Sequence, residues 1–73
     1  KVKEAFEVFE MNYKNDPKSF MTNFGFARAY SAKGDFKKAE KYMKNAVNLA
    51  PDKPSKDQSE AMLQMVKDKK DIN

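Results

Sequence analysis

Residues 23–51 read NFGFARAYSAKGDFKKAEKYMKNAVNLAP, and they carry the strongest indication of the chain's architecture. It divides into two apolar-periodic segments separated by Gly34, a residue type that ends helices by taking a left-handed conformation. Both segments contain small residues, among them Ala27 in the first and Ala39 in the second. Small residues at facing positions let two antiparallel helices approach, while larger apolar residues fill the groove between them. The stretch therefore predicts a helical hairpin in which Ala39 faces the first helix near Ala27.

The second half of this stretch has a counterpart upstream. Three positions recur at an interval of 34 residues: Ala5, Phe9 and Pro17, followed by Ala39, Met43 and Pro51. Together with Asn23, Phe26, Ala27 and Tyr30, the second copy resembles the tetratricopeptide repeat (TPR), whose period is 34 residues. Two positions depart from the family pattern. Asn23 stands where the family has a bulky aromatic, and Met43 replaces an aromatic with another large apolar side chain.

Four helical segments are predicted from the spacing of apolar residues and from the residues that start and stop helices. They are expected at about 2–13, 18–33, 36–49 and 55–69. Asp16 is expected to cap the second segment with Pro17 at its first position, because proline suits the start of a helix. Asp35 is expected to cap the third segment.

The fourth segment differs from the others. A capping box at Ser55 to Gln58 is expected to open it, after a loop containing two prolines. Adding 34 to the key positions of the second segment leads to polar residues such as Glu60 and Gln64, so the third copy is out of register or absent. A polar helix with one narrow apolar stripe suits the end of a repeat array. The stripe is expected at Ala61, Met62, Met65 and Val66.

The resemblance implies an all-α fold of antiparallel helical hairpins, a four-helix fragment of a right-handed TPR-like superhelix. Within a single domain of 1–73, residues 1–17 would be the second helix of a preceding repeat, 18–53 a full repeat and 54–73 a capping helix. Because the chain opens inside a repeat and has no initiator methionine, we expect it to be a fragment of a longer protein.

The composition argues against an enzyme. Without histidine or cysteine, the chain has no ordinary general base near neutral pH and no thiol nucleophile. Its two glycines are isolated, so there is no phosphate-binding loop, and its acidic residues lack the spacing of a calcium loop. No apolar run approaches the roughly 20 residues that span a bilayer. We expect no catalytic residue, no metal or cofactor site and no membrane partner.

In TPR proteins the first helix of each repeat lines a concave groove that binds peptides. The resemblance implies that this groove is lined here by Met21, Phe24, Arg28 and Ser31, with Gly25 beside the row leaving room for another backbone. The alternative is that Met21 and Phe24 pack against another helix. The family's carboxylate clamp is not expected, because Phe24 and Arg28 stand in place of its lysine and asparagine.

A second candidate surface is a possible anion patch on the third segment, at Lys37, Lys41 and Lys44. Glu40 lies four residues before Lys44, where it can form an ion pair, and no aromatic residue is expected on that face for base stacking. These features favour a solvated face over a nucleic-acid site.

The expected function is therefore that of a protein-interaction or assembly module that binds a protein or peptide. The alternative is a structural C-terminal appendage that packs on an upstream catalytic domain and has no ligand of its own. The first helix lacks a hairpin partner, so Val2, Phe6 and Phe9 are expected to leave apolar surface uncovered. That surface predicts a homodimer or packing on an upstream domain.

Overall fold

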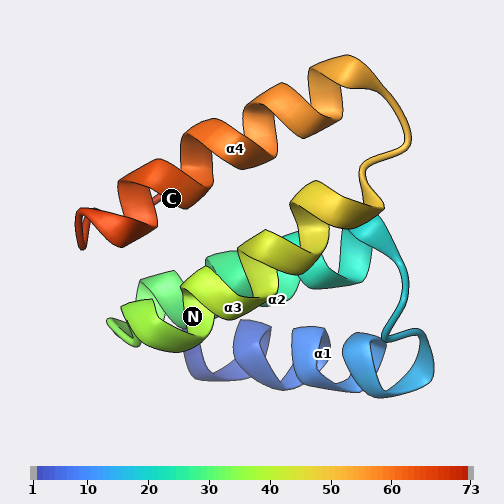
Figure 1. Ribbon diagram of the computed structural model, residues 1–73. Helices are drawn as coiled ribbons and strands as arrows, with labels where there is room; N and C mark the ends of the chain where they lie inside the picture. Colours follow the sequence, from blue (N-terminus) through green and yellow to red (C-terminus); the bar gives the residue numbers. More distant parts are fainter. Residues whose placement is uncertain (1, 73) are drawn as a thin grey trace.

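The computed structural model describes residues 2–72, and within this range the chain is all-α, as predicted. Its helices are α1 (Val2–Asn15), α2 (Phe20–Lys33), α3 (Phe36–Leu49) and α4 (Lys53–Lys67). Each helix packs on the next along the chain and runs antiparallel to it (Figure 1). Helices α2 and α3 form the central hairpin, with α1 along one side and α4 along the other.

The turn between α2 and α3 follows the prediction closely. Gly34 has φ 85°, and its N–H donates to the Ser31 carbonyl oxygen at 3.0 Å. The Asp35 N–H donates to the Tyr30 carbonyl oxygen at 3.0 Å, which completes a Schellman motif at the end of α2. The Asp35 carboxylate then accepts from the Lys38 N–H at 3.2 Å and caps α3.

The starts of α2 and α4 differ from the prediction. Ser19, not Asp16, caps α2, because its Oγ accepts from the Thr22 N–H. Similarly, Asp52 caps α4 in place of Ser55, whose N–H donates to the Asp52 carboxylate at 2.9 Å. Proline at the second position of α4 does not break the helix, since the first-turn N–H groups have no intrahelical partner.

The core lies between α2 and α3. Ala27 and Ala39 are both fully buried, which fits the predicted close contact of the two helices, and Met43 and Ala46 are fully buried beside them. Aromatic side chains from α1, α2 and α3 extend this core on one side as a single cluster: Phe6, Tyr13, Phe26, Tyr30 and Tyr42. The rings of Tyr30 and Tyr42 are stacked with centroids 5.5 Å apart.

Asn23 is fully buried where the family pattern has an aromatic residue. Its Nδ2 donates to the carbonyl oxygens of Pro17, at 2.8 Å, and Ser19, at 2.9 Å. Its Oδ1 accepts from Asn45 Nδ2 at 3.3 Å. The amide therefore ties the α1–α2 loop to both helices of the central hairpin, a role that an aromatic ring cannot fill.

The inward face of α4 shares two residues, Met62 and Val66, with the stripe expected from the sequence and differs at the other positions. Ala61 and Met65 are exposed, and the residues that face α3 and the core are Ser59, Met62, Leu63 and Val66. This row has the spacing of Asn23, Phe26, Ala27 and Tyr30 on α2, and each member lies 36 residues after its counterpart.

The polar member of each row makes the same local hydrogen bond. Ser59 Oγ donates to the Ser55 carbonyl oxygen, and Asn23 donates to the Ser19 carbonyl oxygen, in both cases four residues back. The inward row of α2 therefore recurs once on α4, displaced by two residues from the 34-residue interval.

Helix α1 buries more of its apolar face than expected. Phe6 contacts the rings of Phe26 and Tyr30, and Phe9 lies so close to Gly25 that a Cβ there would be 2.7 Å from its ring. A side chain, not a backbone, thus occupies the space that Gly25 leaves. The large uncovered apolar residues of α1 are instead Val8 and Met11, at 57% and 64% exposed. The Val2 side chain lies outside the part that the structure describes.

Candidate partner-binding groove

Three of the four residues assigned to the groove lie along the outer face of α2. Met21 is 75% exposed, Arg28 is exposed, and Phe24 is half-buried beside Phe20, with ring centroids 5.4 Å apart. Steps of three and four residues place Met21, Phe24 and Arg28 in one row on a helix. The row offers an apolar surface with a cation at one end.

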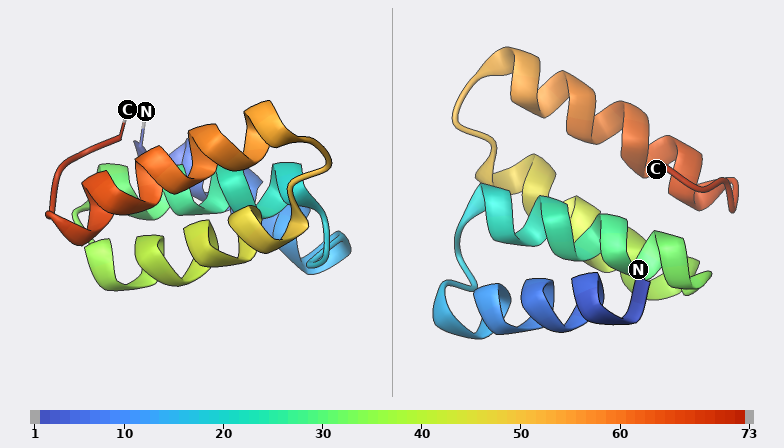
Figure 2. Two further views of the ribbon diagram at one scale, coloured as in Figure 1. Left: turned by 45° about the horizontal axis from the view of Figure 1, so that its top comes forward. Right: turned by 180° about the vertical axis from the view of Figure 1, so that it is seen from behind.

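Ser31, the fourth residue, is only 2% exposed, because the end of the chain covers it. Ser31 Oγ donates to Asp71 Oδ1 at 3.0 Å and accepts from the Ile72 N–H at 3.2 Å. The tail after α4 turns back toward α2, as Figure 2 shows. The site therefore holds a segment of its own chain at the Ser31 end and is open at the Met21 end.

The turn of the tail toward α2 begins at Lys69, which has a left-handed backbone conformation. Lys69 has φ 59°, its N–H donates to the Val66 carbonyl oxygen at 2.9 Å, and the Lys70 N–H donates to the Met65 carbonyl oxygen at 2.8 Å. This is the Schellman geometry seen after α2, with lysine in place of glycine. A lysine in this conformation is strained, since its Cβ crowds the backbone.

Ile72 anchors the tail. It is 9% exposed and belongs to the same buried cluster as Val66 and Ala27. Asp71 and Lys70 on the same segment are exposed. The sequence analysis did not identify this contact, although one signal was present: Ile72 is the single branched apolar residue in an otherwise charged tail.

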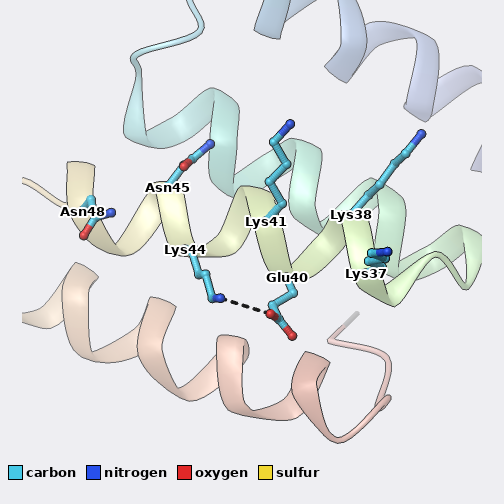
Figure 3. A pocket seen from close by; sticks show the side chains of 7 residues that line it. All are labelled: Lys37, Lys38, Glu40, Lys41, Lys44, Asn45 and Asn48. Atoms are coloured by element: carbon cyan, nitrogen blue, oxygen red, sulfur yellow. Dashed lines mark ion pairs between the residues drawn. The ribbon is translucent and has the colours of Figure 1, made fainter.

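The lysines of the possible anion patch lie on the exposed face of α3 (Figure 3). They line an open hollow of about 730 Å³ with neighbouring polar side chains: Lys37, Lys38, Glu40, Lys41, Lys44, Asn45 and Asn48. The expected ion pair is present, with Lys44 Nζ 3.2 Å from Glu40 Oε2. The patch is thus partly neutralised at its edge.

Aromatic rings do lie beside these lysines, contrary to the expectation. Lys41 Nζ is 5.4 Å from the centroid of the Tyr42 ring, and Lys38 Nζ is 5.5 Å from that of Tyr30. Burial raises the pKa of both tyrosine hydroxyls above the usual value, since the rings belong to the core cluster. The rings are therefore packed against other rings of the core, where they are poorly placed to stack on a nucleic-acid base.

A smaller hollow of about 480 Å³ lies between α1 and the end of α2, lined by Lys3, Phe6, Glu7, Glu10 and Lys33. Lys33 Nζ lies 4.1 Å from the centroid of the Phe6 ring, a cation–π distance. Charges of both signs surround this hollow, so it favours no ligand of one charge.

Within residues 2–72, no cluster of acidic side chains has the arrangement of a metal site. In the same range, no helix combines the length and apolar character needed to cross a membrane. No protein-family model, curated protein or solved structure is significantly similar to this chain. The geometry of the α2 face is accordingly the basis for assigning a function.

Proposed function

We propose that this chain is a TPR-type interaction module that binds an extended peptide segment of a partner protein along the outer face of α2. One observation carries the proposal. The Ser31 end of this face already holds a segment of the tail after α4, through a hydrogen bond from the backbone N–H of Ile72 and one to the Asp71 carboxylate. A surface that binds the backbone of one peptide segment has the chemistry needed to bind another.

The open part of the face supports the proposal. Met21 and Phe24 supply apolar area next to the cation of Arg28. Aromatic residues and arginine are enriched among interface positions whose truncation costs about 2 kcal/mol or more. We expect Phe24 and Arg28 to contribute most of the binding energy, with Met21 adding contact area.

The repeat character of the chain supports the assignment to the TPR type. The 34-residue interval relates α1 to α3, and the 36-residue interval relates α2 to α4. Arrays of this kind bind partners on the surface formed by corresponding helices. In this chain those helices are α2 and α4, and the tail lies against both.

The test is a random peptide library displayed on phage and selected on the immobilised chain, followed by fluorescence anisotropy of the enriched peptides. We expect Phe24→Ala with Arg28→Ala to weaken binding at least tenfold while the helical circular dichroism signal is kept. Lys37→Ala with Lys41→Ala, on the exposed face of α3, is the matched control and should leave binding nearly unchanged. The reverse ranking would place the site on the lysine patch and overturn the proposal.

A second candidate function is favoured by α1. Val8 and Met11 are large, exposed apolar residues on the same helix. Such a surface is typical of a helix that packs on another protein surface. It supports the reading of the chain as a structural appendage or a homodimer, and it can coexist with a peptide groove on α2.

A further inference from the structure

Resting on the proposed groove of α2, we infer that the C-terminal tail is a built-in ligand of this groove and that external partners resemble it. The partner segment would carry an acidic residue followed directly by a branched aliphatic residue, as Asp71 and Ile72 do. Binding of the partner would require displacement of the tail.

The chemistry of the Ser31 hydroxyl defines this preference. A serine hydroxyl has one hydrogen to donate and can also accept. Here the hydrogen is donated to the Asp71 carboxylate and a lone pair accepts from the Ile72 N–H. An amide or a carbonyl oxygen could replace the carboxylate as acceptor, but a hydrogen bond to a charged acceptor is stronger. The site therefore selects an acidic side chain next to a free backbone N–H.

Burial of Ile72 supplies the second element of recognition. Its side chain is inserted against the core cluster that contains Val66, whereas Asp71 remains exposed. A side chain with similar branching and volume can fill the same space, and a charged one cannot. The motif is thus an acidic residue that accepts a hydrogen bond from the Ser31 hydroxyl, followed by an aliphatic residue whose shape fits the space that Ile72 fills.

The tail is held in a way that permits exchange. The turn that returns it to α2 requires a left-handed lysine at position 69, which opposes the docked state. An external segment of the same chemistry meets no such strain. A segment that is held by a single buried side chain, with exposed residues before it, also opens at a lower free energy than the core.

The experiment uses the full chain and a fluorescein-labelled peptide with the sequence KDKKDIN, that of residues 67–73. Ile72→Asp releases the tail by placing a charge in the buried site, and Ala61→Asp adds the same charge at an exposed position of α4 as a control. We expect anisotropy to show at least about tenfold tighter peptide binding to Ile72→Asp than to the parent or the control. In the released variant, Ser31→Ala should lose most of that gain. Peptides in which Lys replaces the residue that corresponds to Asp71 or the one that corresponds to Ile72 should not bind.

A second variant keeps the test decisive if Ile72→Asp does not fold. Lys69→Gly removes the strain of the turn, so the tail should dock more firmly and the peptide should bind more weakly than to the parent. Addition of unlabelled peptide to the parent should shift the Ile72 methyl resonances toward values of an exposed side chain. Equal peptide affinity in the parent and Lys69→Gly, with unshifted Ile72 resonances at saturating peptide, would overturn the inference.

Failure of the inference and failure of the proposed function give different results. Suppose that library peptides bind through Phe24 and Arg28, lack the acid–aliphatic pair and have the same affinity for the parent and for Lys69→Gly. In that case only the tail inference is wrong. If no library peptide binds the α2 face in either tail state, the proposed function is wrong as well.

Discussion

At the scale of single residues, the most informative position is one that departs from the repeat pattern. Asn23 departs from the pattern, yet its buried amide makes three hydrogen bonds, two to carbonyl groups of the α1–α2 loop and one to Asn45 on α3. A buried polar group that loses its partners costs more than the net value of the hydrogen bond itself. Both its donors and its acceptor are therefore expected to matter for stability.

We expect Asn23→Ala to lower the free energy of unfolding by about 1–3 kcal/mol, because it removes the side-chain hydrogen bonds of a fully buried amide to the Pro17 carbonyl oxygen and to Asn45. Urea denaturation followed by circular dichroism measures the change. Asn48→Ala, an exposed position on α3, is the control and should change stability by less than about 0.5 kcal/mol. A loss at Asn23 no larger than that of the control would contradict the role of the amide.

The contact between the two small residues of the central hairpin gives a second prediction. Ala39 is fully buried, so Ala39→Leu should overpack the crossing of α2 and α3 and cost about 1–3 kcal/mol. Ala32→Leu introduces the same side chain on the exposed side of α2 and should be nearly neutral. Thermal unfolding compares the two variants, and similar midpoints would show that Ala39 does not lie at a tight crossing.

At the scale of helices, the sequence predicted spans better than ends. Gly34 and Asp35 together predicted the α2–α3 turn, because glycine followed directly by aspartate is typical of a helix end and the start of the next helix. Ser19 and Asp52 were missed because several capping residues lie close together before α2 and α4, and propensity does not choose among them. The inward face of α4 was missed because a fixed interval of 34 residues was applied, whereas the inward row of α4 follows that of α2 by 36 residues.

The cap of α4 predicts a dependence on pH. Hydrogen bonds from Ser55 lower the pKa of the Asp52 carboxyl below its ordinary value of 3.8. A carboxyl with a lowered folded-state pKa adds stability above its unfolded pKa, and this contribution is lost as the pH falls through the folded value.

Asp52→Asn keeps a good capping residue but removes the charge. We expect the parent to be the more stable of the two at pH 6, and the difference to shrink as the pH falls below about 3.8. Urea unfolding at pH 6 and at pH 2.5 measures it. A difference that is constant over this range would mean that the charge of Asp52 does not contribute.

At the scale of the whole molecule, the candidate site on α2 could be predicted from the sequence only in part. The spacing of Met21, Phe24 and Arg28 predicted a common face, because helical geometry follows from sequence separation. The covering of Ser31 depends on a contact across 41 residues, between the end of α2 and Ile72. No local pattern encodes a contact of that range. Likewise, the exposure of Val8 and Met11 on α1 follows from the inward packing of Phe6 and Phe9, which depends on contacts with α2.

The exposed apolar pair of Val8 and Met11 on α1 predicts self-association. We expect sedimentation equilibrium to show a concentration-dependent dimer, and Val8→Lys with Met11→Lys to convert it to a monomer by placing charges in the contact. Met21→Lys, at a similarly exposed position on the outer face of α2, is the control and should leave the dimer intact. A parent chain that is monomeric at the highest concentrations would contradict this prediction and leave α1 for a different partner.

The aromatic cluster of the core has a consequence for spectroscopy. The chain contains no tryptophan and three tyrosines, and the rings of Tyr13, Tyr30 and Tyr42 all belong to that cluster. Intrinsic emission and near-ultraviolet dichroism therefore report on the junction of α1, α2 and α3, where the tyrosines are in contact. Residues 53–73 contain no aromatic residue, so we expect loosening of α4 or its tail to affect these signals only through Tyr30, which shares a buried cluster with Val66 and Ile72. Far-ultraviolet dichroism, which includes α4, would then change at lower denaturant than tyrosine emission whenever the last helix detaches first.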